Sequence, residues 1–164
     1  MFDAITISKE KQEELRLIVE DQYNDIKAKE ISPAKLSETI SAFANASGGD
    51  IYVGIREETR SKCRYIEGFS RIEDVNDHIT VLDSLPGLNG NYSVSFLSFL
   101  DKSYCMHITI FKTQTIVKTT QNEIYIRKGA QNLKCVGQDN LRRLELDKGI
   151  FPYENEKVPE SDMS

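Results

Sequence analysis

ISAFANASGGDIYVGI, residues 40–55, joins a helical pattern to a strand pattern through a pair of glycines. Apolar side chains leading up to the glycines recur at helical spacing, at Leu36, Ile40, Phe43 and Ala44. Gly48 and Gly49 can adopt the left-handed backbone conformation that ends a helix. Beyond them the apolar residues alternate as they do in a strand, at Ile51, Val53 and Ile55. The stretch therefore predicts a helix with one buried face, an abrupt end and a strand over 51–55.

The elements around this centre follow from similar signals. Ser32 can accept a hydrogen bond from a free helix N–H group and Pro33 suits the first helical position, so the central helix is predicted to begin there. Upstream we expect a helix over 8–19 and a short strand over 22–29. Downstream we expect a return strand over 65–68 and a helix that begins at a capping box in 70–73 and ends at Pro86–Gly87. Further strands are predicted at 92–100, 104–112, 115–118 and 123–127, before a last helix over 138–146. This order predicts a single α+β domain with helices packed on a mixed, largely antiparallel sheet.

Length and composition limit the class of protein. The chain has 164 residues, 39% of them apolar, and a formal net charge of −5, as expected for one ordinary soluble domain. We place this domain at 1–147 and predict that 148–164, with two prolines and several acidic residues, is a flexible acidic tail. No apolar run approaches the roughly 20 residues that a membrane helix needs, and the first residues are too polar for a secretion signal. We therefore expect a cytoplasmic protein with no membrane partner.

Several kinds of site are not expected. The three cysteines are odd in number and lack any CxxC spacing, so neither a disulfide framework nor a structural zinc site is predicted. Gly48–Gly49 is not followed by the GxxxxGK[ST] pattern of a nucleotide-binding loop, and a helix cap explains both glycines. His107 falls on a predicted strand with no Ser or Cys partner that the sequence can place near it, so we expect a half-exposed strand histidine rather than a catalytic one.

Four stretches together resemble the Schlafen AlbA-like domain family. They are AFANASGG with IYVGI at the centre, Glu20–Lys27 upstream, Ile124–Ala130 downstream, and a closing helix from Asp139 to Leu146. In order and spacing the resemblance covers about residues 8–147. It implies an AlbA/Schlafen-core-like fold and a function connected with nucleic acid. Some members of the family only bind nucleic acid, whereas others cut RNA.

The resemblance also implies a three-carboxylate site. The members that cut RNA share three acids, which correspond to Glu20, Asp25 and Glu57, and Asp25 stands where the family usually has Glu. Carboxylate oxygens suit Mg²⁺ or Mn²⁺, and such a metal can position a water and stabilise charge on a phosphate. Lys27 belongs to the same motif and resembles a phosphate contact or an electrostatic stabiliser beside the acids. The alternative is that these acids are surface charges, or ion-pair partners of Lys27, Lys29 and Arg56.

The spacing of the first two acids sets a structural condition. Glu20 and Asp25 lie five residues apart, so a single straight strand would place their side chains on opposite faces. They can converge only if Glu20 belongs to a helix end or a bend. Arg56, just before Glu57, could instead pair with Glu20 and withhold it from a metal.

A basic stretch lies in the second half of the chain. From Lys112 to Arg143, seven basic residues stand against two acidic ones. A local basic face on an acidic protein would hold phosphate groups, and the guanidinium of an arginine at a strand end matches phosphate oxygens well. The predicted nucleic-acid contacts are Lys27, Lys29, Lys118, Arg127, Lys128 and Lys134. The alternative is that these residues are only the solvated faces of strands and helices.

Nucleic-acid binding, to RNA or DNA, is therefore the predicted function. Two alternatives stay open. The first is a metal-dependent endoribonuclease that acts on tRNA or another structured RNA, with Mg²⁺ or Mn²⁺ as its cofactor. The second is a protein-interaction domain that has lost nucleic-acid binding. The sequence also leaves open a homodimer or a larger complex, and a role in defence or in transcriptional regulation.

Overall fold

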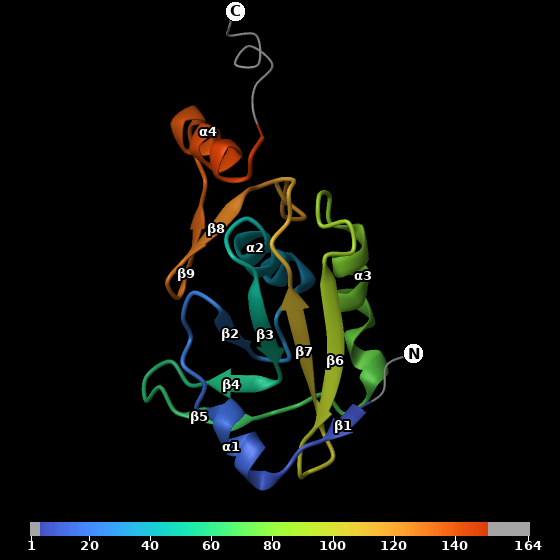
Figure 1. Cartoon of the computed structure of the whole chain (residues 1–164). Coiled ribbons are helices and arrows are strands. Elements are labelled where there is room, and N and C mark those ends of the chain that lie inside the picture. The colour runs from blue at the N-terminus through green and yellow to red at the C-terminus, as the bar shows by residue number, and fades with distance from the viewer. Residues whose placement is uncertain (1–3, 151–164) are drawn as a thin grey trace, which may run out of the picture.

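The computed structural model describes residues 4–150, which form four α-helices, one short 3₁₀ helix and nine strands (Figure 1). The helices are α1 (Lys9–Arg16), α2 (Pro33–Ala44), η1 (Ile72–Val75), α3 (Asn76–Ser84) and α4 (Gln138–Asp147). The strands are β1 (Ala4–Thr6), β2 (Asn24–Lys27), β3 (Gly49–Val53), β4 (Ile55–Glu57), β5 (Arg64–Ile66), β6 (Tyr92–Ser98), β7 (Tyr104–Ile110), β8 (Tyr125–Lys128) and β9 (Gln131–Lys134). No helix within 4–150 is both long and apolar enough to cross a membrane.

Five strands form the main sheet in the order β1-β6-β7-β3-β2. The two outer pairings, β1 with β6 and β2 with β3, are parallel, and the two inner pairings are antiparallel. Two smaller antiparallel sheets, β4–β5 and β8–β9, stand apart from it. The predicted α+β fold with a mixed sheet is confirmed.

Two apolar clusters fill the domain, one on each side of the main sheet. The larger cluster joins α2 and α3 to inward side chains of β3, β6 and β7, and includes Phe43, Val53 and Ile108. The smaller cluster joins α1 and β4 to the sheet through Leu15, Ile55 and Cys105. Figure 1 shows α2 against β3, with α1 and the β4–β5 hairpin grouped at one end of the molecule. This arrangement brings the loop before β2, the β4–β5 hairpin and the end of β2 into one region.

The central helix begins and ends as its sequence predicts. Ser32 Oγ accepts a hydrogen bond from Lys35 N at 3.1 Å, and Pro33 occupies the first turn. At the other end Gly48 has a positive φ of 78° and donates its N–H to Phe43 O at 2.8 Å. Gly49 allows a close approach, because a Cβ there would lie 2.6 Å from the Phe43 ring. The double glycine therefore both ends α2 and lets β3 pack directly under it.

The predicted strand over 51–55 is wrong at its last two residues. Gly54 has φ of 126°, a conformation that side chains with a Cβ rarely adopt, and it lies between the backbones of Gly68 and Tyr104. The chain bends there, so that β3 stays in the main sheet while β4 leaves it and pairs with β5. This bend directs Glu57, at the end of β4, away from the main sheet.

Other predicted boundaries are also corrected. The first helix is capped by Ser8 but ends at Arg16, and the first charged strand is limited to β2. The capping residue of the next helix is Arg71, whose N–H donates to Asp74 Oδ2 at 3.2 Å, and that helix starts with a 3₁₀ turn. The predicted strand at 115–118 is reduced to a bridge between Lys118 and Ile124. The strands β1 and β9 were not predicted, and most of the proposed tail, 151–164, lies outside the described residues.

Two glycines with the same backbone conformation allow a matched test of packing at the α2–β3 junction. A Cβ at Gly48 would lie 2.6 Å from Ile110 O, whereas a Cβ at Gly90, with φ of 77°, meets nothing within 4 Å. We expect Gly90→Ala to destabilise the domain by about 1 kcal/mol through backbone strain alone. Gly48→Ala should cost at least about 1 kcal/mol more because it also displaces β7. Urea unfolding followed by circular dichroism measures both, and equal midpoints would contradict this account of the junction.

Candidate functional site

Glu20 and Asp25 meet through a bend in the chain. Glu20 lies in the irregular segment between α1 and β2, and its Oε2 accepts a hydrogen bond from Ile26 N at 3.1 Å. This bond turns the Glu20 side chain back along β2, next to the carboxyl group of Asp25. The odd spacing of the two acids is therefore accommodated by the bend that the sequence analysis required.

Asp25 is buried, at 3% exposure, between two cations. Its Oδ1 lies 3.3 Å from Nη2 of Arg127, and its Oδ2 lies 3.0 Å from Nζ of Lys27. The Lys27 contact is an ion pair without good hydrogen-bond geometry. Within residues 4–150, Oδ2 has no hydrogen-bond partner. Lys27 thus lies beside the acids, where the sequence analysis expected it.

The pKa of Glu20 is raised to about 7. Burial contributes most, because it disfavours the charged carboxylate, and the hydrogen bond to Asp25 adds to it. The Ile26 N–H and the Lys27 ammonium act in the opposite direction. Glu20 therefore keeps its proton on a substantial fraction of molecules at neutral pH.

Glu57 lies in the same groove but has a different partner. A cavity of about 310 Å³ is lined by Glu20, Lys27, Glu57 and Arg64, among others. Glu57 Oε2 lies 3.4 Å from Arg64 Nε. Arg56, the expected competitor for Glu20, instead binds Glu67 at 3.0 Å and lies over the ring of Tyr65.

The three acids do not fit a divalent metal in this arrangement. Asp25 is paired with Arg127 and Lys27, the pKa of Glu20 is raised to about 7, and Glu57 is paired with Arg64. Among residues 4–150, no group of three or more His, Cys, Asp or Glu side chains is placed to hold a metal ion. The proposed metal ligands are thus brought to one groove without forming a coordination sphere.

Arg127 corrects one predicted phosphate contact. Its side chain is 1% exposed and is held by hydrogen bonds from Nε to Asp21 O, from Nη2 to Asn24 O and from Nη1 to Asn132 Oδ1. The guanidinium also lies 4.7 Å from the centre of the Phe43 ring. With its donors used inside the protein, Arg127 cannot contact a phosphate and instead positions Asp25.

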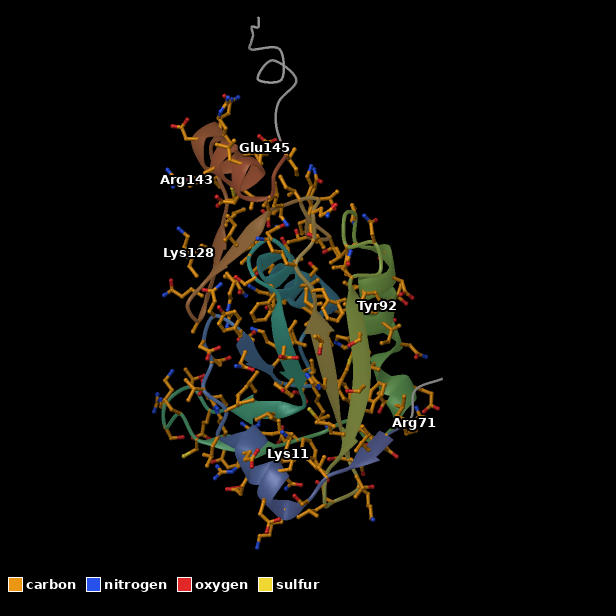
Figure 2. The ribbon with its side chains drawn as sticks, in the orientation of Figure 1. Lys11, Arg71, Tyr92, Lys128, Arg143 and Glu145 are labelled. Carbon is orange, nitrogen blue, oxygen red and sulfur yellow. The ribbon has the colours of Figure 1, made fainter. Side chains whose placement is uncertain are left out.

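The other predicted basic contacts differ in how free they are. Lys128 is exposed on β8, and Figure 2 shows it extending from the same side of the molecule as Arg143 of α4. Lys134 Nζ pairs with Glu123 at 2.5 Å. Lys118 is half-buried in its bridge to Ile124, and Lys29 is half-buried in the segment between β2 and α2. Of these four, Lys128 is the exposed cation with no carboxylate within 4.0 Å in the described chain.

Arg64 is a site residue that the sequence analysis missed. It lines the groove of Glu20 and also a second, open cavity of about 630 Å³ that reaches the β8–β9 turn at Ala130. Its Nη1 donates to the carbonyl groups of Ile18 and Arg16. The strand that carries it has three residues, too few for a periodic pattern to place it.

Comparison with known proteins assigns the chain to a family. The family model described as Schlafen, AlbA_2 matches residues 20–136, which is more than half of the chain. The chain belongs to the Schlafen AlbA_2 family. The match includes Glu20, Asp25, Lys27 and Glu57, and it ends before α4.

A solved structure shares the fold of this Schlafen AlbA_2 domain. The crystal structure of the DIP2311 protein from Corynebacterium diphtheriae superposes with a TM-score of 0.56 at 16% sequence identity. The match covers 77% of this chain and 24% of that one, so the chain spans about a quarter of that protein's length. No curated protein matches the chain.

The raised pKa of Glu20 gives the AlbA_2 domain a defined pH dependence. Glu20 binds its proton more tightly in the folded domain, with a pKa of about 7, than at its ordinary value of 4.5 in an unfolded chain. The contribution of Glu20 to the free energy of unfolding is therefore fully present below pH 4.5 and is lost as the pH rises to 7. Glu20→Gln keeps an acceptor for Ile26 N and a donor for Asp25. Between pH 4.5 and 8 the free energy of unfolding of this variant should therefore fall by about 1–2 kcal/mol less than that of the wild type, a value that includes screening by water.

Urea unfolding at a series of pH values from 4.5 to 8 measures this difference. Glu14→Gln is the control, because Glu14 lies on α1 with 70% of its side chain exposed. Its pH profile should match that of the wild type. A Glu20→Gln profile parallel to the wild type would contradict the raised pKa of Glu20.

Proposed function

We propose that this Schlafen AlbA_2 domain binds nucleic acid along the side formed by the β4–β5 hairpin, the β8–β9 hairpin and α4. The observation that carries the proposal is that two cavities with cationic walls meet at the β8–β9 hairpin. One is lined by three basic residues, Arg16, Lys62 and Arg64, and by two acids, Glu20 and Glu57, and it reaches Ala130 in the turn of that hairpin. The other is lined by Lys128 and Arg143, between the hairpin and α4. A flexible polyanion can follow such a path, because each lysine or arginine replaces a condensed counterion at a phosphate.

The charge balance supports a local interface over general attraction. The chain carries a formal net charge of −5, so its surface as a whole repels nucleic acid. Exposed apolar side chains accompany the cations on the proposed side: Leu17 and Val19 line the first cavity, and Leu133 lines the second. Such side chains can contact bases while the cations contact phosphates. Family membership adds to this support, because the Schlafen AlbA_2 family is connected with nucleic acid.

Cleavage of RNA is the second candidate function, and the Glu20–Asp25 pair favours it. A carboxyl group with a pKa of about 7 can accept a proton from an attacking hydroxyl and return it to a leaving oxygen at neutral pH. Lys27, 26% exposed at its side chain, can place positive charge beside a phosphate in the same groove. Loss of all nucleic-acid interaction would leave the third function, a protein-interaction domain.

Binding is tested with a fluorescent single-stranded oligonucleotide and a DNA duplex over a range of salt concentrations. Lys62→Ala and Lys128→Ala should each weaken binding and reduce the slope of log affinity against log salt by about 1. Arg71→Ala is the control, since Arg71 extends from the opposite side of the molecule (Figure 2) and should leave the slope unchanged. Absence of binding at low salt, or equal effects of all three changes, would exclude the proposed interface.

Cleavage is tested by incubation with total tRNA, another structured RNA and a DNA duplex, in Mg²⁺, in Mn²⁺ and in chelator. If the acid pair acts, Glu20→Gln should abolish RNA fragments on a denaturing gel and leave binding largely intact, and Glu14→Gln should cut as the wild type does. Fragments that need a metal would support the metal-dependent form, and fragments in chelator would support proton transfer by the acid pair alone. Intact RNA in every lane rejects cleavage under these conditions.

A further inference from the structure

A cavity of about 490 Å³ lies between α4, the β8–β9 hairpin and the C-terminal end of α2. It is separate from the groove of Glu20, and no residue lines both. Cavities of this size hold ligands with the dimensions of a nucleotide.

The walls of the cavity carry an excess of positive charge. Lys112 follows β7, Lys128 is on β8 and Arg143 is on α4, so three separate parts of the chain bring cations to the lining of one cavity. None of the three has a carboxylate within 4.0 Å among residues 4–150, unlike Lys134, which pairs with Glu123. Asp147 is the one acidic residue among the described residues that line the cavity. Cations without carboxylate partners around one cavity favour an anion there.

Lys148 holds the cavity open and adds to its charge. Its ammonium group donates to Ala44 O at 3.0 Å, Thr113 O at 2.7 Å and Thr113 Oγ1 at 3.0 Å, which ties the end of α4 to the end of α2. All three of its donors are used, so Lys148 is a wall of the cavity and not a ligand contact. Burial, with a smaller contribution from the nearby charge of Lys112, lowers the pKa of Lys148 to about 8. An anion in the cavity would relieve this crowding of positive charge.

The floor of the same cavity is apolar. Ile126 of β8, Leu133 of β9 and Leu144 of α4 line it. Asn140 lies at the rim and donates to Val136 O, which leaves its side-chain oxygen to accept from a ligand. An apolar floor with a cationic rim suits a ligand that has a flat, weakly polar part and a charged part.

We propose that this cavity binds a nucleoside monophosphate unit, with the base against Ile126, Leu133 and Leu144 and the phosphate between Lys112, Lys128 and Arg143. The unit has two sources with the same chemistry, a free mononucleotide or the 5′-phosphorylated end of a strand. The second source rests on the proposed function, whereas the first does not.

The test measures binding of AMP, adenosine and inorganic phosphate by calorimetry at low salt. AMP should bind at least about tenfold more tightly than either of its parts, because both the floor and the rim are used. Arg143→Ala should weaken AMP binding at least about tenfold. Arg142→Ala is the matched control, since Arg142 is the exposed neighbour on α4 that does not line the cavity, and it should bind AMP as the wild type does. As a second measurement, the pKa of Lys148 should rise above 8 when AMP is bound.

Two oligonucleotides, identical except for a 5′-phosphate or a 5′-hydroxyl, separate the sources. Tighter binding of the phosphorylated strand, lost in Arg143→Ala, assigns the cavity to strand ends. AMP binding without any preference between strands assigns it to a free nucleotide. Failure to bind AMP, or equal effects of the two arginine changes, overturns the inference. If the protein binds oligonucleotides but not AMP, the proposed function is supported and this site is rejected. If it binds AMP but not oligonucleotides, this site is supported and the proposed function is rejected.

Discussion

The buried guanidinium of Arg127 is the contact on which the region around the acid pair depends. An arginine at 1% side-chain exposure is tolerated only if its charge is paired and its N–H groups are satisfied. Asp25 supplies the charge. The carbonyl groups of Asp21 and Asn24 and the side-chain oxygen of Asn132 accept hydrogen bonds, and the Phe43 ring covers the face of the guanidinium. The same side chain therefore joins the β8–β9 hairpin, β2 and α2. It also holds the buried Asp25 side chain in place beside Glu20, whose pKa is raised mainly by its own burial.

A second polar network explains why α2 carries Ser41 and Asn45 on its buried face. Asn45 Nδ2 donates to Val117 O and Tyr125 O, and its Oδ1 accepts from Val117 N. Ser41 Oγ donates to Val117 O and accepts from Tyr125 N. The segment between β7 and β8 has little regular structure, so its backbone groups need such partners to be buried without loss of stability. The last turn of α2 and its C-cap, from Ser41 to Asn45, thus supply both apolar packing and hydrogen bonds from one buried face.

What the sequence predicts well is local. Ser32, Pro33 and Gly48 act within a turn of their own position, so the limits of α2 follow from the chain alone. The bend that brings Glu20 to Asp25 could be required from their odd spacing, but its form depends on a hydrogen bond to Ile26 N. The end of β3 at Gly54 could not be predicted, because the close backbone of Gly68 and Tyr104 comes from distant parts of the chain. Arg127 was misjudged for the same reason. A strand-end arginine has the same sequence pattern whether it faces water or, as here, an aspartate and a phenylalanine ring.

The uneven charge of the domain also bears on how quickly a partner arrives. The proposed interface would combine a net charge of −5 with the exposed cations Lys128 and Arg143 on one side, so a polyanion would meet repulsion from the protein as a whole and attraction only near these two residues. Encounters in the wrong orientation are then short, and those in the right one are prolonged. At physiological salt this field fades within about 8 Å of the surface. The field therefore acts on the orientation of a partner only when the partner is within a few water layers of the surface. This distribution of charge affects the association rate as well as the stability of a complex.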